Sequence, residues 1–250
     1  MNMETLQKIT RLLPILAILV SISQPGHAKQ EIPDYQQSVE QMMKQEKANK
    51  KGSGFSKDDM RIMKESGEQL AIALPEPGLK AGERAPDFTL PDAWGKPVNL
   101  AEELKKGPVV LVFYRGAWCP FCNLHLHALH NSQAYFKKYN AQLIAITPQK
   151  PDKSSEQIKK DKYEFKILSD LDDSVMRAYK LLYSLNAELI DVYKKHGLDV
   201  EAYNGEGRVT LPIPATYVID RKGIIRAVHA DTDYKKRMEP AAIIEALSRL

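Results

Sequence analysis

The stretch Trp118-Cys119-Pro120-Phe121-Cys122 decides the fold, because it joins a predicted strand to a predicted helix. Residues 108–114 before it form an apolar, β-branched run of strand length, and residues 123–139 after it have a helical pattern. Both cysteines therefore stand where a helix begins. The unpaired N–H groups and the positive dipole end of a first helical turn favour a thiolate there.

The spacing of the two cysteines favours dithiol redox chemistry. Cys119 and Cys122 are the only cysteines of the chain, and two intervening residues let them close a small disulfide ring. Pro120 is tolerated because its missing N–H costs nothing in a first helical turn. A disulfide across so short a loop constrains little of the unfolded chain, so we predict a catalytic or redox-cycling pair of cysteines rather than a structural disulfide.

Strands and helices alternate after this stretch. This alternation favours a three-layer α/β domain whose sheet is largely parallel at its centre. The predicted elements are a hairpin around Trp94-Gly95-Lys96, strands at 141–147 and 165–168, helices at 154–161, 172–180 and 185–197, a polar loop at 198–208, a hairpin at 216–229 and a closing helix at 239–250.

Residues 1–28 have the pattern of a secretory signal peptide. Two basic residues precede an apolar run at 12–22, and Gly26 and Ala28 occupy the two positions that must be small for cleavage. The run is too short to span a bilayer, so we expect no stable membrane anchor after cleavage. The predicted location is the periplasm or the outside of the cell, where disulfides persist.

Residues 29–80 form a predicted helical N-terminal extension. Its first part, 30–51, is polar and has the pattern of an exposed helix or a loosely attached arm. Ser56 and Asp59 make a capping box for a second helix, and a Pro- and Gly-containing stretch then ends the extension. The main domain is predicted at 81–250.

The positive charge gives no sign of nucleic-acid binding. The formal net charge of +4 is spread over separate lysine pairs rather than one block, and no aromatic residues interleave with them. We interpret these lysines as solvated surface.

Residues 81–250 contain a set of motifs with a strong family likeness. These motifs are 82–90 (GERAPDFTL), 109–122 (VVLVFYRGAWCPFC), 145–149 (AITPQ), 168–170 (LSD) and 214–223 (PATYVIDRKG). Together they resemble the thioredoxin-fold peroxiredoxins of the alkyl hydroperoxide reductase and thiol-specific antioxidant family. The resemblance implies a thioredoxin-like fold, with a central mixed sheet and helices on both faces.

The cysteine stretch departs from the typical peroxiredoxin pattern. Laid on that pattern, Cys122 takes the place of the peroxidatic cysteine, Cys119 that of a threonine and Arg115 that of a proline. The second arginine of the family would fall near Ile213 or Pro214, where this chain has none.

The same stretch is similar to thioredoxins and to periplasmic thioredoxin-like reductases. Those proteins have a Trp-Cys-x-x-Cys motif, which Trp118 begins here, and a cis-proline facing the cysteines, which Pro214 matches. A proline of this kind leaves an open backbone edge for the extended chain of a substrate. The resemblances thus imply a hybrid between a peroxidase and a dithiol reductase.

Two mechanisms follow from these resemblances. In a thiol peroxidase, Cys122 attacks the peroxide, Cys119 resolves the sulfenic acid as a disulfide, and an external thioredoxin-like dithiol restores both. Arg115 would supply positive charge to the thiol and the peroxide, unless it is a surface residue. In a thiol–disulfide oxidoreductase the order reverses: Cys119 attacks a disulfide substrate, Cys122 resolves, and Trp118 shields the pair.

A third interpretation is a copper- or zinc-binding module, because His125, His127 and His130 follow the cysteines. Residues 125 and 127 point to different helix faces, so at most a partial ligand set converges. We therefore expect no metal and no other cofactor, and histidines that form hydrogen bonds on the helix surface. Whether the chain forms a homodimer stays open.

Overall fold

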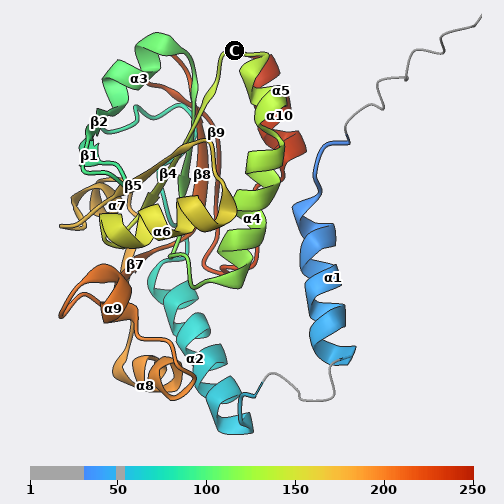
Figure 1. Ribbon diagram of the computed structural model, residues 1–250, viewed down its shortest axis with the longest axis vertical. Coiled ribbons are helices and arrows are strands. Elements are labelled where there is room, and N and C mark those ends of the chain that lie inside the picture. The colour runs from blue at the N-terminus through green and yellow to red at the C-terminus, as the bar shows by residue number, and fades with distance from the viewer. Residues whose placement is uncertain (1–30, 49–53) are drawn as a thin grey trace, which may run out of the picture. The chain divides into compact units, whose positions relative to one another are not determined.

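The cysteine stretch follows the central strand of a five-stranded mixed sheet with the strand order β5-β4-β3-β8-β9 (Figure 1). The computed structural model describes residues 31–48 and 54–250. β3 runs parallel to β4 and β4 to β5, whereas β8 and β9 are antiparallel, which confirms the predicted mixed α/β sheet. The strands are β3 (Val109–Phe113), β4 (Gln142–Thr147), β5 (Lys166–Ser169), β8 (Ala215–Ile219) and β9 (Ile225–Ala230).

Strand β3 is buried on both faces, as its continuous apolar sequence predicts. Val109, Leu111 and Phe113 point into one hydrophobic cluster, and Val110 and Val112 point into another on the opposite face. The central strand therefore holds the chain rigidly up to the point where the cysteine stretch begins.

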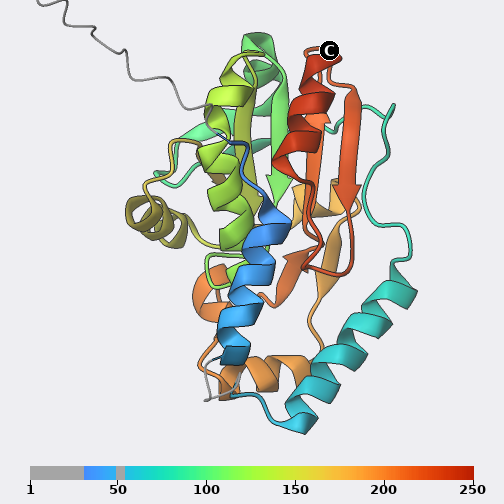
Figure 2. The same ribbon diagram turned by 90° about the vertical axis from the view of Figure 1, so that its right-hand side faces the viewer.

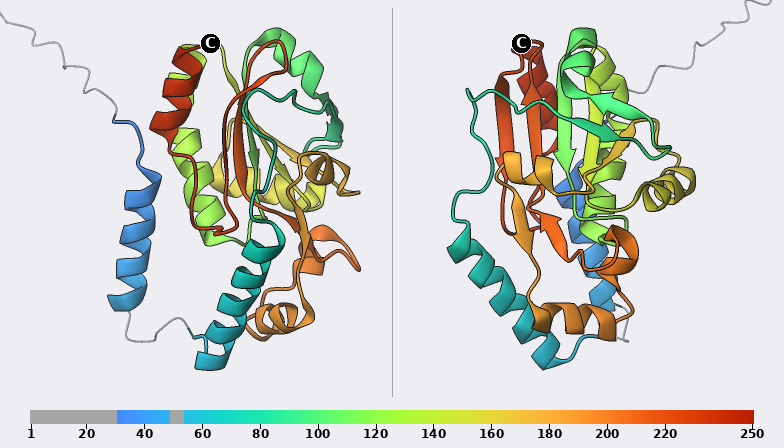
Figure 3. Two further views of the ribbon diagram at one scale, coloured as in Figure 1. Left: turned by 180° about the vertical axis from the view of Figure 1, so that it is seen from behind. Right: turned by 90° about the vertical axis from the view of Figure 1, so that its left-hand side faces the viewer.

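Helices cover both faces of the sheet (Figure 3). On the face that holds the cysteines lie α4 (Pro120–Asn131), α5 (Gln133–Lys137), α6 (Pro151–Asp161) and α10 (Pro240–Ser248). On the other face lie α3 (Leu100–Lys106), α7 (Ser174–Ala178) and the predicted hairpin of β1 (Thr89–Pro91) and β2 (Pro97–Asn99).

The extension forms two helices, α1 (Tyr35–Ala48) and α2 (Lys57–Ala73). Of the two alternatives for 30–51, α1 is the exposed helix and not the loosely attached arm, because it lies beside α4 (Figure 2). Its Tyr35 and Val39 are buried in a cluster with Ala128 of α4. The capping box of α2 is confirmed, and Asp59 in it also contacts Lys195 on α8 (Ala187–Lys195) at 2.9 Å. No helix within 31–48 and 54–250 is long and apolar enough to cross a membrane. The predicted signal peptide lies outside the described residues.

Some short elements differ from the prediction. The helix expected at 123–139 breaks at Ser132, whose hydroxyl donates to the carbonyl of Ala128. The expected polar loop at 198–208 contains the five-residue helix α9 (Val200–Asn204), and β6 (Leu182–Ser184) pairs with β7 (Thr210–Pro212). Elements this short have too few residues to display a periodic pattern.

Candidate active site

The two cysteines lie at the start of α4, as predicted. Cys119 is the N-cap residue, Pro120 is in the first turn and Cys122 follows within that turn. Both are free thiols with about 1% of their surface exposed. The site is therefore a reduced dithiol, buried beneath the surface at the positive end of a helix.

The surroundings give the two thiols opposite pKa shifts. Burial opposes ionisation of Cys122, but the hydrogen bond with Cys119 and the charges of Arg237 and Arg115 lower its pKa to about 5. Burial and the hydrogen bond with Cys122 raise the pKa of Cys119 well above its ordinary value. Cys122 is thus the thiolate of the pair, and Cys119 keeps its proton.

Arg237 makes the direct contact with the thiolate, and sequence reasoning missed it. Its Nη2 atom donates to the Cys122 sulfur at 3.4 Å, and only 8% of the residue is exposed. Arg237 lies between β9 and α10, separated from Cys122 by 115 positions in the chain. A guanidinium is therefore present beside the sulfur, although the family position near Pro214 lacks one.

Arg115 is buried rather than on the surface, with 3% of it exposed. Its Nη2 atom donates to the Tyr193 hydroxyl at 2.6 Å, and its guanidinium lies 4.5 Å from the ring centre of Tyr234 and 4.8 Å from that of Trp118. These aromatic faces hold the cation without neutralising it. Arg115 is thus a buried cation whose charge lowers the pKa of Cys122, while its predicted role toward the peroxide stays a prediction.

Trp118 is fixed by close packing at the turn before the cysteines. A Cβ atom built on Gly116 would lie 2.4 Å from the Trp118 Nε1 atom, so only glycine allows this approach. The indole also packs against the Tyr193 ring at a centroid distance of 6.0 Å. Trp118 therefore packs against the core cluster that contains both cysteines, and its predicted role as a shield of the dithiol stays a prediction.

A buried polar network fixes the backbone of the turn. The Gln149 Oε1 atom accepts from the Ala117 N–H at 3.0 Å, and Asn123 Nδ2 donates to the Ala117 carbonyl at 2.7 Å. Gln157 donates to Asn123 and accepts from the Tyr114 hydroxyl. These bonds tie the turn to the strand before it and the helix after it, so the cysteines are preorganised.

A cavity of about 460 Å³ leads to the dithiol. Cys119 lines it, together with aromatic side chains and Arg115, whereas Cys122 is not among its lining residues and contacts Arg237. The extension contributes Phe55 and Met63 to the wall. The cavity therefore presents aromatic surface and Arg115 beside Cys119.

Pro214 lies close to the end of β3, because the residue after it, Ala215, pairs with Phe113. The structure has no cis peptide bond in the described residues, so Ile213–Pro214 is trans, unlike the proline it was matched to. Pro214 and Arg115 both line a groove of about 340 Å³ between α2 and the segment before α8.

The three histidines do not converge. His125 is buried, not on the helix surface as expected, and its Nε2 atom lies 3.1 Å from the Met238 carbonyl oxygen. His127 faces Asp161, whereas His130 contacts Gln133. Among the described residues no group of three or more metal-ligating side chains has the geometry of a metal site.

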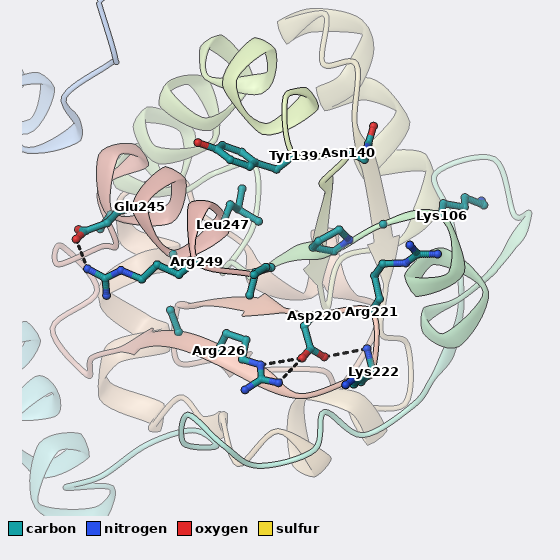
Figure 4. A pocket seen from close by; sticks show the side chains of 16 residues that line it. Lys106, Tyr139, Asn140, Asp220, Arg221, Lys222, Arg226, Glu245, Leu247 and Arg249 are labelled. Carbon is teal, nitrogen blue, oxygen red and sulfur yellow. Dashed lines mark hydrogen bonds and ion pairs between the residues drawn. The ribbon is translucent and has the colours of Figure 1, made fainter.

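A larger cavity, of about 850 Å³, lies away from the cysteines where β3 begins (Figure 4). Its basic residues are largely engaged: Arg226 pairs with Asp220 and Arg249 with Glu245, as the dashed lines mark. It contains no thiol and no histidine. The candidate active site among the described residues is therefore the dithiol with Arg115 and Arg237.

Comparison with known proteins places the chain in a family. The model of the AhpC/TSA family matches residues 81–228. The chain belongs to this family. It is 30% identical to "Peroxiredoxin Bcp" of Escherichia coli over 153 residues, 61% of this chain and 86% of that protein.

A second relative in sequence and a solved structure are also similar to this chain. The chain is 28% identical to "Thioredoxin-like protein YneN" of Bacillus subtilis over 166 residues, covering 66% of this chain and 79% of that one. The crystal structure of the peroxidoxin BcpB from Mycobacterium tuberculosis superposes with a TM-score of 0.55 at 22% identity, covering 69% of this chain and 98% of that chain. The AhpC/TSA chain thus has the fold of the peroxiredoxin structures, and its family makes it an oxidoreductase.

Proposed function

We propose that this protein is a thiol-dependent peroxidase in which Cys122 attacks the peroxide and Cys119 resolves the product. The observation that carries the proposal is the contact between the Arg237 guanidinium and the Cys122 sulfur at 3.4 Å, inside a buried site. Attack needs a thiolate, and this contact stabilises one at neutral pH. Family membership supports the same reaction class.

In the first step the Cys122 thiolate attacks one peroxide oxygen: an S–O bond forms and the O–O bond breaks. The departing alkoxide or hydroxide takes the proton of the Cys119 thiol, whose raised pKa has kept it protonated. Arg115 and Arg237 stabilise the negative charge that passes from sulfur to oxygen. The sulfur of Cys122 is then a sulfenic acid and Cys119 a thiolate.

In the second step the Cys119 thiolate attacks the sulfenic sulfur of Cys122: an S–S bond forms, the S–O bond breaks, and the departing hydroxide takes a proton from solvent to become water. The peroxide has been reduced by two electrons, and the dithiol has been oxidised to a disulfide. An external dithiol of the thioredoxin type then reduces the disulfide by exchange.

Stopped-flow oxidation of the reduced protein, followed by Trp118 fluorescence, tests this order of events. Wild type and Cys119→Ser are expected to react with hydrogen peroxide far faster than a free thiol, whereas Cys122→Ser loses the fast phase. Cys119→Ser should stop at a sulfenic acid that dimedone traps. If all three proteins react no faster than a free thiol, the peroxidase proposal fails.

A thiol–disulfide oxidoreductase is the second candidate, and one observation favours it. Cys119, not Cys122, lines the cavity and so meets an incoming disulfide first. In this case Cys119 attacks, Cys122 resolves, and insulin reduction is fast while peroxide turnover is negligible. Parallel insulin and peroxide assays on the same preparation separate the two functions.

We also propose that the mature protein begins after residue 28 and works in the periplasm or outside the cell. The basic residues, short apolar run and small residues of 1–28 support this location. Mass spectrometry of the protein purified from its native host would give the mature N-terminus. A chain that keeps residues 1–28 and stays with the cytosolic fraction would contradict the proposal.

A further inference from the structure

The segment that carries Arg237 has little structure of its own. Residues 235–239, which we call the Arg237 segment, lie between β9 and α10 outside any helix or strand. The Arg237 guanidinium donates to the carbonyls of Tyr234 and Lys236 as well as to the Cys122 sulfur. What keeps this segment in place therefore decides whether the guanidinium reaches the sulfur.

The first turn of α1 binds both ends of the Arg237 segment. The Tyr35 hydroxyl donates to the Lys235 carbonyl at 2.6 Å. At the other end, the two Glu239 carboxylate oxygens accept from the backbone N–H groups of Tyr35 at 2.9 Å and Gln36 at 3.0 Å. These N–H groups begin a helix and have no partner within it, so a carboxylate is a favourable ligand for them.

The middle of the segment is held by the helix that carries the cysteines. His125 on α4 lies 3.1 Å from the Met238 carbonyl oxygen, and burial and Arg237 lower the pKa of His125 to about 3. The ring is therefore neutral and donates its Nε2–H to this carbonyl. The Tyr35 ring, 1% exposed, packs edge-on against His125 with a centroid distance of 5.4 Å. Tyr35 thus joins the segment to the cysteine helix.

We propose that α1 is part of the active site: Tyr35 and Glu239 position the Arg237 segment so that its guanidinium meets the Cys122 sulfur. Neither residue touches the thiol chemistry itself, so both are positioning residues. Without the Tyr35 hydroxyl bond the Arg237 segment can move outward, and the guanidinium moves away from the Cys122 sulfur. The thiolate then loses the stabilisation that the guanidinium provided. This proposal rests on Cys122 being the thiolate of the proposed function, and it does not depend on which substrate the thiolate attacks.

A double-mutant cycle on the full chain tests the proposal. Tyr35→Phe keeps the ring on His125 but removes the hydroxyl bond, and Arg237→Met removes the guanidinium. The readout is the pKa of Cys122, from the ultraviolet absorbance of the thiolate titrated against a Cys122→Ser baseline. We expect Tyr35→Phe to raise this pKa by about 0.5 to 1, a roughly three- to tenfold weaker acid, and to have almost no effect when Arg237→Met is already present.

Tyr179→Phe is the matched control. Its hydroxyl also donates to a backbone carbonyl, that of Pro86 at 3.0 Å, but it packs on the opposite face of the sheet. Neither substitution is meant to change a charge: burial raises the pKa of Tyr35, so the hydroxyl that Tyr35→Phe removes is neutral. We therefore expect Tyr179→Phe to leave the pKa of Cys122 unchanged. Equal shifts from Tyr35→Phe with and without Arg237, or no shift in either, would overturn the proposal.

Glu239→Gln provides a second test through the sign of its effect. Direct electrostatics predicts that losing a negative charge near the site lowers the pKa of Cys122 or leaves it unchanged. Positioning predicts the opposite, a rise, because the amide keeps one acceptor oxygen and its NH2 group cannot accept from the second N–H of the first turn of α1. A lowered or unchanged pKa would contradict the role of Glu239. If the pKa couplings hold but peroxide is not turned over, the proposed substrate is wrong and the positioning role stands.

Discussion

Replacing Arg237 by methionine should turn Cys122 from a thiolate into a thiol at neutral pH. The guanidinium lies 3.4 Å from the sulfur, and both groups are buried. Methionine keeps much of the length and apolar bulk of the side chain but removes the charge. The stabilisation of the thiolate by Arg115 and by the hydrogen bond with Cys119 remains, so the variant isolates one contribution.

The size of the effect follows from Coulomb's law. Two unit charges 3.4 Å apart interact by about 5 kcal/mol at an effective dielectric constant of about 20. Water that enters the space left by the guanidinium solvates the thiolate and so reduces the difference in thiolate stability between wild type and variant. An effective dielectric constant of about 40, which halves the interaction, represents this case. Since about 1.4 kcal/mol corresponds to one pKa unit, the pKa of Cys122 should rise from about 5 by about 2 to 3.5.

The thiolate titration described above measures this shift, and alkylation by iodoacetamide as a function of pH gives an independent value. Arg221→Met is the control, because it removes an arginine that donates only to the Lys105 carbonyl far from the cysteines. We expect no change in that variant. A rise of less than about 0.5 in Arg237→Met would refute the claim that this contact holds the thiolate.

Three further outcomes follow from the same contacts. The pKa of Cys122 is depressed, so its ionisation stabilises the reduced fold at high pH, and this stabilisation is lost as the pH falls. The free energy of unfolding, measured with urea, should therefore rise by up to about 1.4 kcal/mol per pH unit between about pH 5 and 9. Cys122→Ser should not show this rise. Gly116→Ala places a Cβ 2.4 Å from Trp118 and should cost about 1 to 3 kcal/mol, with altered tryptophan fluorescence in the folded protein. The hydrogen bonds from Lys195 and other donors hold the pKa of Asp59 below its ordinary value, so the difference in thermal stability between wild type and Asp59→Asn should shrink as the pH falls below about 4.

The position of the dithiol was predictable from local sequence. A buried strand followed directly by Cys119-Pro120-Phe121-Cys122 and a helix requires only neighbouring residues, and the structure has this arrangement. The same holds for the capping box of α2, which needs Ser56 and Asp59 alone. Such features follow from the chain's own geometry over a few residues.

The electrostatics of the site were not predictable in this way. Arg237 reaches Cys122 across 115 positions, from a segment with no periodic pattern and no sequence feature that distinguishes it from a surface arginine. His125 was expected at the surface, because nothing in the composition of 30–51 indicated that Tyr35 would pack on it. Both contacts depend on where distant segments meet, which the sequence of either segment alone does not specify.

The two arginines also bias the redox equilibrium of the dithiol. Only the reduced form has a thiolate, so whatever stabilises the Cys122 thiolate stabilises the reduced state and not the disulfide. A pKa of about 5 corresponds at pH 7 to about 3 kcal/mol, or roughly 60 mV toward a more oxidising potential. The charge that speeds attack on a substrate therefore also makes the resulting disulfide easier for an external dithiol to reduce. Because α1 holds the Arg237 segment, the same helix contacts would then influence both halves of the catalytic cycle.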